Sequence, residues 1–76
     1  TVEYDIEEAE LSEFLNTWLA SLSRDERILF MRRYFNGEAV NKLAKDYGIS
    51  PGKMAQRMYR LRLSLKLSLE KEGYSL

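Results

Sequence analysis

The stretch AVNKLAKDYGISPGKMAQRMYR, residues 39–60, decides the predicted fold. It indicates two helices joined by a tight turn at Gly48, because a glycine just past the last apolar residue of a helix often adopts the left-handed conformation that ends it. Ser50 is suited to cap the second helix, and Pro51 to take its first position, where a missing N–H costs nothing. Ala44 is small where the second helix must cross closely. With a basic second helix, this pattern predicts a helix-turn-helix whose second helix enters the DNA major groove; a plain helical hairpin is the alternative.

The second of these helices has two distinct faces. Met54, Met58 and Leu61 recur at helical spacing and are expected to be buried. The residues off that face are polar or basic: Lys53, Gln56, Arg57 and Arg60. A basic, exposed helix face is suited to phosphate contacts.

Near the end of the chain, hydrophobic residues follow the alternating pattern of a strand, which conflicts with the helix predicted there. Five leucines between residues 61 and 69 alternate with polar residues, as in a strand. No turn residue separates them from the preceding helix and no sheet is predicted, so we expect the helix to continue to about Lys71. Leu63 and Leu67 then project opposite the core face, beside Tyr59. They are either ordinary exposed leucines or a contact with another chain.

Length and composition predict one small domain. The chain has 76 residues, 45% of them hydrophobic, with 12 basic and 12 acidic side chains, which is typical of a globular domain. It contains no cysteine, so it has no disulfide framework. No apolar run approaches the roughly 20 residues that a membrane span needs, and we expect a cytoplasmic protein without membrane contact. Because the chain begins at Thr1 without a methionine, we expect it to be a domain excised from a longer protein.

The net charge of zero conceals a strong asymmetry. Residues 1–30 contain eight acidic and two basic side chains, a net charge of −6. Residues 31–76 contain ten basic and four acidic side chains, a net charge of +6. Either these are ordinary solvated faces, or the basic half meets phosphates while the acidic half is held away from them.

The remaining pattern predicts an all-α fold of four helices, at about residues 6–21, 24–35, 39–47 and 51–71, with a long recognition helix at the C-terminal end. Capping boxes are expected at Asp5 with Glu8 and at Ser23 with Glu26. The first helix has an apolar stripe formed by Leu11, Phe14, Leu15, Trp18, Leu19 and Leu22. In the second helix the residues expected to be available for burial are Ile28, Leu29, Met31 and Phe35.

Residues 22–73 resemble region 4 of bacterial RNA polymerase sigma factors. The resemblance lies in the Leu22-Ser23 start, the segment RRYFNG at residues 32–37, the Gly48-Ile49-Ser50 turn, the segment RMYR at residues 57–60 and the terminal LEKEG at residues 69–73. It is strongest toward the short sigma factors of the extracytoplasmic-function type and related alternative types. It covers about two-thirds of the chain.

The resemblance implies a promoter-recognition domain that binds the −35 element. Carried over by matching positions, the DNA-facing residues are Ser50, Gly52, Lys53, Gln56, Tyr59 and Arg60, with Arg33 on backbone phosphate. Arg57 is expected on a phosphate or an acidic neighbour, and Tyr59 has packing beside Leu63 as its alternative. Ala55 stands where many relatives have a basic residue, and Leu63 and Leu67 replace part of a basic tail. Both departures predict weak intrinsic DNA affinity and a shallow salt dependence.

The resemblance also implies protein partners. Region 4 binds the flap of the polymerase β subunit through its first two helices, and we expect Phe30 and Tyr34 to remain exposed and receive the flap helix in a helix-in-groove contact. An anti-sigma protein is a further partner for the same surface. Leu63 and Leu67 are candidate residues for another protein contact. The isolated domain is expected to be a monomer.

Two other function classes remain open. A different helix-turn-helix regulator would share the turn and would require dimerisation on a palindromic site. A protein-interaction module that has lost DNA binding would use Tyr59, Leu63 and Leu67. An enzyme is not expected, because the chain has no histidine, no cysteine and no glycine-rich phosphate loop, and neither a metal nor a cofactor is predicted.

Overall fold

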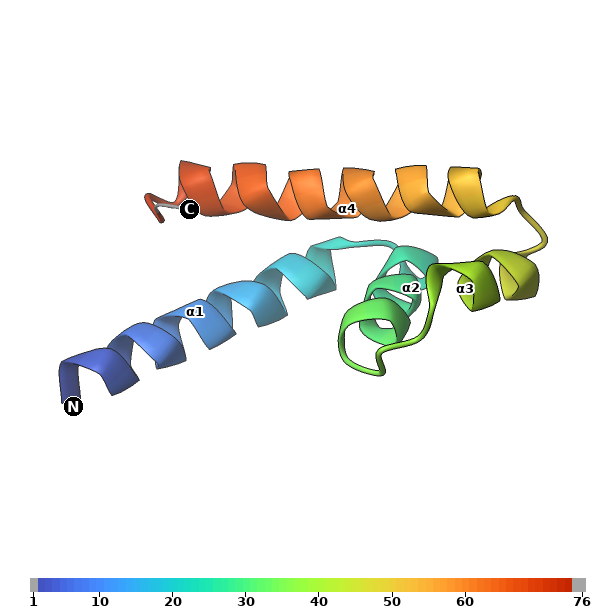
Figure 1. The fold of residues 1–76 in the computed structure, drawn as a ribbon. Helices are drawn as coiled ribbons and strands as arrows, with labels where there is room; N and C mark the ends of the chain where they lie inside the picture. The colour runs from blue at the N-terminus through green and yellow to red at the C-terminus, as the bar shows by residue number, and fades with distance from the viewer. Residues whose placement is uncertain (1, 75–76) are drawn as a thin grey trace.

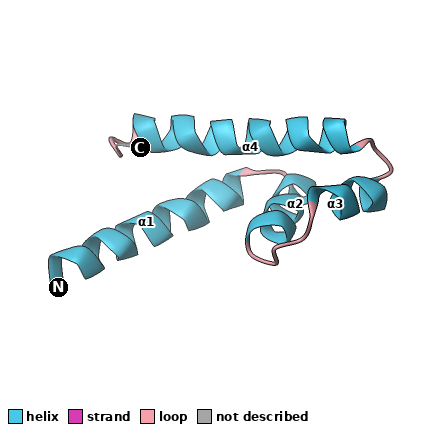
Figure 2. Cartoon of the chain, in the orientation of Figure 1, coloured by secondary structure: helices cyan, strands magenta, loops and turns pink. Residues whose placement is uncertain are grey.

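The computed structural model describes the backbone of residues 2–74 and the side chains of residues 8–74. This part of the chain forms four helices and no strand: α1 (Val2–Ser21), α2 (Arg24–Tyr34), α3 (Val40–Tyr47) and α4 (Pro51–Lys71). In Figure 1, α4 runs along one side of the molecule, with α1 below its C-terminal half and α2 and α3 below its N-terminal half. Figure 2 shows that only short connections separate the helices. The predicted all-α class with four helices is therefore confirmed.

The turn between α3 and α4 follows the local sequence signals. Gly48 has φ 69° and ψ 30°, the left-handed conformation that a residue with a Cβ adopts only with strain. Its N–H donates to the carbonyl of Lys45 at 3.2 Å, and the N–H of Ile49 donates to the carbonyl of Ala44 at 3.0 Å. These two bonds form a Schellman motif, which satisfies the last carbonyls of α3. α4 then begins with Ser50 as its N-cap.

The other helix ends are only partly as predicted. Ser23 caps α2, and the capping box with Glu26 is complete. α1 starts at Val2 and not at Ile6, so Asp5 lies inside the helix and the capping box expected there is wrong. Residues 2–7 contain neither glycine nor proline, and nothing in the sequence therefore stops the helix from extending.

The hydrophobic core joins all four helices. Trp18 of α1 packs edge-to-face on Phe30 of α2, with ring centroids 5.0 Å apart. Leu43 of α3 and Met54 of α4 have no exposed surface. The remaining core members are buried as well: Leu29, Ala44, Met58 and Leu61. The core face predicted for α4 is confirmed.

The core contribution predicted for α2 is mostly wrong. Leu29 is buried as expected, but Ile28, Met31 and Phe35 are exposed. Residues 28–31 are four successive apolar residues, so either of two faces of this short helix could have been buried. Trp18 contacts the face that contains Phe30. Burial on this helix was decided by its neighbours, which the period alone does not identify.

α1 is less deeply packed than the other helices. Only Trp18 of its predicted stripe is buried, while Leu11 is 39% exposed. The remaining stripe residues are half-buried: Phe14, Leu15, Leu19 and Leu22. Figure 1 shows the first turns of α1 diverging from α4, which contributes to an elongated molecule of 45 × 22 × 21 Å.

Candidate nucleic-acid interface and partner groove

The outer side of α4 presents the residues predicted to face DNA. At 100° per residue, Gly52, Gln56 and Tyr59 lie opposite the buried Met54 and Met58. Lys53 and Arg60 lie together along one edge of this face, and all of these outer residues are exposed. The inner side is fixed against α3, so the outer side is held on a rigid support.

The first turn of α4 contains one open amide. The hydroxyl of Ser50 accepts a hydrogen bond from the N–H of Lys53 at 3.2 Å, and the carbonyl of Ser50 accepts from the N–H of Met54 at 3.0 Å. Pro51 has no N–H. Within residues 2–74 the N–H of Gly52 has no hydrogen-bond acceptor, and a Cβ at Gly52 would meet nothing within 4 Å. An approaching anion would therefore find this amide unobstructed.

Arg57 and Arg60 border a shallow depression of about 400 Å³ that they share with Asp25 and Glu26 of α2. No ion pair joins these residues across it in the described part of the chain. Arg57 lies nearer the core face than Arg60. Asp25 and Glu26 thus lie near Arg57, for which a phosphate or an acidic neighbour was expected rather than a base.

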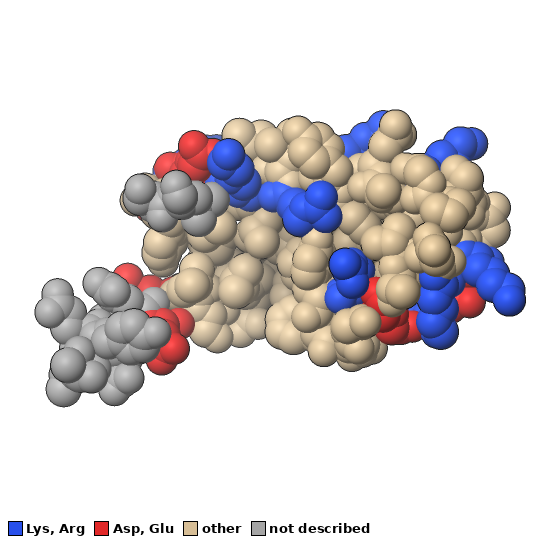
Figure 3. Space-filling model, viewed as in Figure 1, with Lys and Arg blue, Asp and Glu red and all other residues tan. Residues whose placement is uncertain are grey.

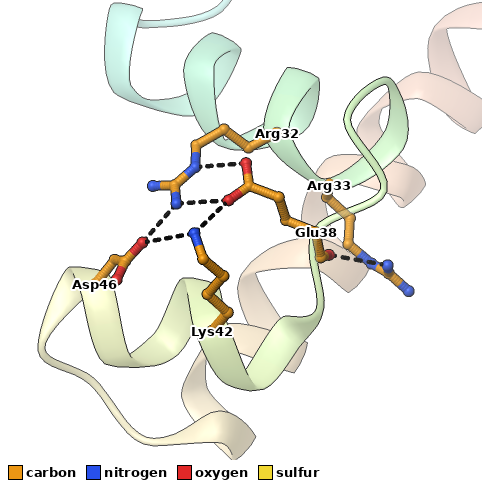
Figure 4. Close-up of polar contacts among 5 residues, drawn as sticks. All are labelled: Arg32, Arg33, Glu38, Lys42 and Asp46. Atoms are coloured by element: carbon orange, nitrogen blue, oxygen red, sulfur yellow. Dashed lines mark hydrogen bonds and ion pairs between the residues drawn. The ribbon is translucent and has the colours of Figure 1, made fainter.

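Arg33 lies apart from α4, in the last turn of α2. Its Nη1 donates to the carbonyl of Glu38 at 3.1 Å, and its guanidinium carbon is 5.9 Å from the centroid of the Tyr34 ring. The structure therefore does not bring Arg33 into one cluster with the residues of α4. Figure 4 shows its side chain directed away from the ion pairs that its neighbours form.

Those ion pairs link α2, the following loop and α3 (Figure 4). Arg32 binds Glu38 with two parallel hydrogen bonds, of 2.9 Å from Nε and 2.8 Å from Nη2, and it also binds Asp46. Lys42 Nζ lies 2.8 Å from Glu38 Oε1 and 3.5 Å from Asp46 Oδ2. We call these four residues the Arg32 cluster. It links the end of α2 and the following loop to α3.

The Arg32 cluster changes how its members titrate. Hydrogen bonds from Arg32 and then Lys42 lower the pKa of Glu38 to about 2. The hydrogen bond from Arg32 also lowers the pKa of Asp46, and the hydrogen bond to Glu38 raises the pKa of Lys42. All four groups are therefore charged at neutral pH.

Three large apolar side chains remain on the outer side of α4. Tyr59 is 57% and Leu67 is 58% exposed, and Leu63 is exposed as well. The prediction that these residues point away from the core is confirmed. The exposure of Tyr59 is compatible both with a DNA contact and with packing beside Leu63, which follows it by one turn.

An apolar groove of about 430 Å³ lies between α1, α2 and α4. We call it the α1–α2–α4 groove, and its lining residues are Leu15, Leu19, Phe30, Tyr34, Phe35, Arg62, Leu65, Lys66 and Leu69. Tyr34 is exposed at this groove, as predicted. The expectation that Phe30 remains exposed is wrong: only 6% of Phe30 is accessible, because it packs on Trp18 and on Tyr34. Phe30 contributes to the groove lining from a buried position.

Sequence reasoning missed the two cations of this groove. Arg62 donates from Nη1 to the hydroxyl of Tyr34 at 2.8 Å, and Lys66 follows Arg62 by one turn. Their spacing of four residues beside Leu65 and Leu69 was a visible signal. The hydrogen bond to Tyr34 spans 28 residues of sequence, and no local pattern indicates it.

Charge is distributed unevenly over the surface. Figure 3 shows Asp and Glu near the N-terminal end of α1, and Lys and Arg along α4 and around the α3–α4 end, where some acidic side chains interleave with them.

Among the residues that the structure describes, no group of His, Cys, Asp or Glu is arranged to hold a metal ion. No described helix combines the length and apolar character that a membrane crossing requires. No family model matches this chain, and no curated protein has significant sequence similarity to it.

Proposed function

We propose that this chain is the promoter-recognition domain of a bacterial sigma factor, of the extracytoplasmic-function type or a related alternative type. One structural observation supports this function above the others. The outer side of α4 offers an open amide at Gly52 and exposed polar side chains at Lys53, Gln56 and Arg60, on a helix whose inner side is locked into the core. Such a helix start is suited to the major groove of the −35 element.

Each outer residue has a distinct chemical task in this function. Gln56 has the donor and acceptor pair that recognises adenine with two hydrogen bonds. Lys53 and Arg60 neutralise phosphates, and the Gly52 amide donates to a phosphate at the positive end of the helix. Arg33 meets the backbone from α2 while its guanidinium remains bonded to the loop. Tyr59 extends the same surface toward the bases.

We assign the polymerase contact to a different surface, the α1–α2–α4 groove. The α1–α2–α4 groove is lined mostly by apolar and aromatic side chains, of which Tyr34 and Phe35 are exposed. An amphipathic helix such as the β-flap would dock there through its apolar face. Tethering by polymerase would raise the local concentration of the domain at the promoter, which compensates for few phosphate contacts. An anti-sigma protein that covered the groove would block this step.

The test is an amide-resolved NMR titration with short duplexes of randomised −35-like sequence at low salt, followed by selection of the preferred duplex. We expect shifts confined to Arg33 and to residues 50–60. Lys53→Ala should weaken binding, whereas Lys71→Ala, which removes the same charge at the far end of α4, should leave it nearly unchanged. Shifts restricted to α1, or equal effects of the two variants, would reject the recognition helix.

A protein-interaction module is the second candidate. Tyr59, Leu63 and Leu67 form an exposed apolar strip on the outer side of α4. If the domain used this strip for association, its mass in solution would rise with concentration and Leu67→Gln would abolish the rise. A single monomeric mass up to millimolar concentration excludes self-association through this strip.

A further inference from the structure

The α1–α2–α4 groove has a marked charge bias at its border. Seven of its nine lining residues are apolar or aromatic, and the other two, Arg62 and Lys66, are both cationic. None of the lining residues that the structure describes is acidic. A ligand that fills this groove must therefore be apolar over most of its contact area and anionic where it meets α4.

Arg62 is held in place but its charge is not neutralised. Its one hydrogen bond among the described residues goes to the hydroxyl of Tyr34, a neutral acceptor. Neither Arg62 nor Lys66 forms an ion pair within residues 8–74. Arg32, by contrast, is bound by Glu38 and Asp46. A guanidinium has five N–H donors, so Arg62 keeps donors for a carboxylate while Tyr34 orients it.

We propose that this groove selects an amphipathic helix with an acidic side chain beside its apolar face, and that Arg62 and Lys66 determine this selectivity. Tyr34 acts as a positioning residue that holds Arg62 at the border. This inference deepens the proposed function, because the polymerase contact was assigned to the same groove. It adds a requirement on the partner, namely a carboxylate that meets α4.

A helix fits the site better than other anionic ligands. The groove is bounded by three helices. Its exposed border contains Tyr34 and Arg62, residue types that often dominate the binding energy of protein interfaces, and Phe35, a type enriched in such interfaces. A second copy that presented the same groove would bring four cations together. A second copy that presented its acidic α1 remains the competing occupant, and the oligomeric state tests it.

The experiment uses three fluorescein-labelled amphipathic peptides with one shared Leu/Phe face. They differ only in the flanking positions, which are Glu, Gln or Lys. Fluorescence anisotropy with the 76-residue chain should rank their affinities Glu above Gln above Lys, with about a tenfold span between Glu and Lys at low salt that narrows as salt is added. The double variant Arg62→Glu with Lys66→Glu should invert the ranking.

A matched control separates local from overall charge. Lys45→Glu with Lys71→Glu makes the same charge change outside the groove and should preserve the original ranking. Tyr34→Phe should reduce the preference for the Glu peptide over the Gln peptide while the Gln peptide still binds. Equal weakening of all three peptides would instead show that Tyr34 has only a structural role. Circular dichroism and Trp18 fluorescence verify that each variant is folded.

Several results would overturn the inference. Equal binding of the three peptides, or a ranking that survives the charge reversal at Arg62 and Lys66, rejects electrostatic selection. A concentration-dependent dimer that Glu10→Lys with Glu13→Lys dissolves assigns the groove to a second copy. The peptide ranking involves neither DNA nor polymerase, so its failure is distinguishable from failure of the proposed function. If polymerase binds the wild type and the Arg62→Glu, Lys66→Glu variant equally, the proposed sigma-factor function is retained and the proposed selection of an acidic helix is rejected.

Discussion

The α3–α4 half and the α1–α2 half of this domain are stabilised in different ways. α3 meets α4 through side chains without exposed surface, Leu43 and Met54, and the turn between them is fixed by Gly48 and Ser50. Among its described side chains, from residue 8 onward, α1 contributes one that is buried, Trp18, and the others are half-buried or exposed. The α3–α4 half is specified by several local sequence signals and by a close-packed core. The packing of the α1–α2 half depends instead on which neighbouring surfaces cover it.

The largest expected difference between the halves concerns core truncation. Leu43→Ala should lower the free energy of unfolding by about 2–5 kcal/mol, because it leaves a cavity where α3 meets α4. Leu11→Ala, on the exposed part of α1, should change it by less than about 0.5 kcal/mol. Urea denaturation followed by Trp18 fluorescence measures both. Similar losses for the two variants would contradict the contrast between the halves.

The next prediction concerns the outer side of α4. Gln56→Ala should reduce discrimination between the selected duplex and a single-base variant by about 1–3 kcal/mol, because a bidentate base contact is lost. Lys53→Ala should instead weaken both duplexes alike and lower the slope of log affinity against log salt by about one. Competition titrations at several salt concentrations distinguish the two effects. A Gln56 variant with unchanged discrimination would remove this residue from base recognition.

A pair of glycine variants separates backbone strain from binding. Gly48→Ala should destabilise the domain by about 1–2 kcal/mol, because φ is 69° there and no steric clash adds to the cost. Gly52→Ala, in open space within α4, should leave stability unchanged or raise it by up to about 1 kcal/mol. Its DNA affinity should nevertheless fall, since the methyl group covers the free amide. Thermal unfolding and DNA titration together check this prediction, and a fall in stability at both glycines would refute it.

The smallest expected effect concerns pH. The pKa of Glu38 is lowered to about 2 in the folded state from an ordinary value near 4.5. The Arg32 cluster therefore contributes its stability in full above about pH 4.5, and this contribution is lost as the pH falls toward 2. Glu38→Gln should lower the Tm slightly at pH 7 and flatten its decline below pH 4.5. Calorimetry between pH 2 and 7 measures the Tm of both proteins. If the Tm of the wild type and of Glu38→Gln falls in parallel with pH, Glu38 is not the source of the acid sensitivity.

The same contrast explains which structural features could be predicted from the sequence. The Gly48 turn, the Ser50 cap and the Ser23–Glu26 capping box depend on neighbouring residues only, and all three were predicted. Phe30 was expected to remain exposed as a partner contact. Its burial depends on Trp18, which lies twelve positions away, so no local pattern indicated it. The start of α1 was misplaced because no breaker marks it. Local chemistry predicts helix ends, whereas tertiary neighbours decide which face of a helix is buried.

The candidate site shows the same division. The exposure of Lys53, Gln56 and Arg60 follows directly from the helical period of α4. Within the Arg32 cluster, Glu38, Lys42 and Asp46 are spaced four residues apart, a spacing that suits ion pairs on a helix but from which none was predicted. The participation of Arg32 required knowledge of how α2 meets α3. The groove border formed by Tyr34 and Arg62 has no counterpart in the local sequence at all.

The segregation of acidic and basic side chains has a kinetic consequence. A molecule of zero net charge has no overall attraction to a polyanion, yet here acidic side chains gather near the N-terminal end of α1 and basic ones toward the α3–α4 end (Figure 3), so the molecule behaves as an electric dipole. Its long dimension of 45 Å far exceeds the Debye length of about 8 Å at physiological salt. The surrounding ions therefore hide the acidic half from a duplex that the basic half has approached. Encounters with the basic half leading are accelerated and the reverse encounters are repelled, so association of this neutral domain with DNA should slow as salt rises.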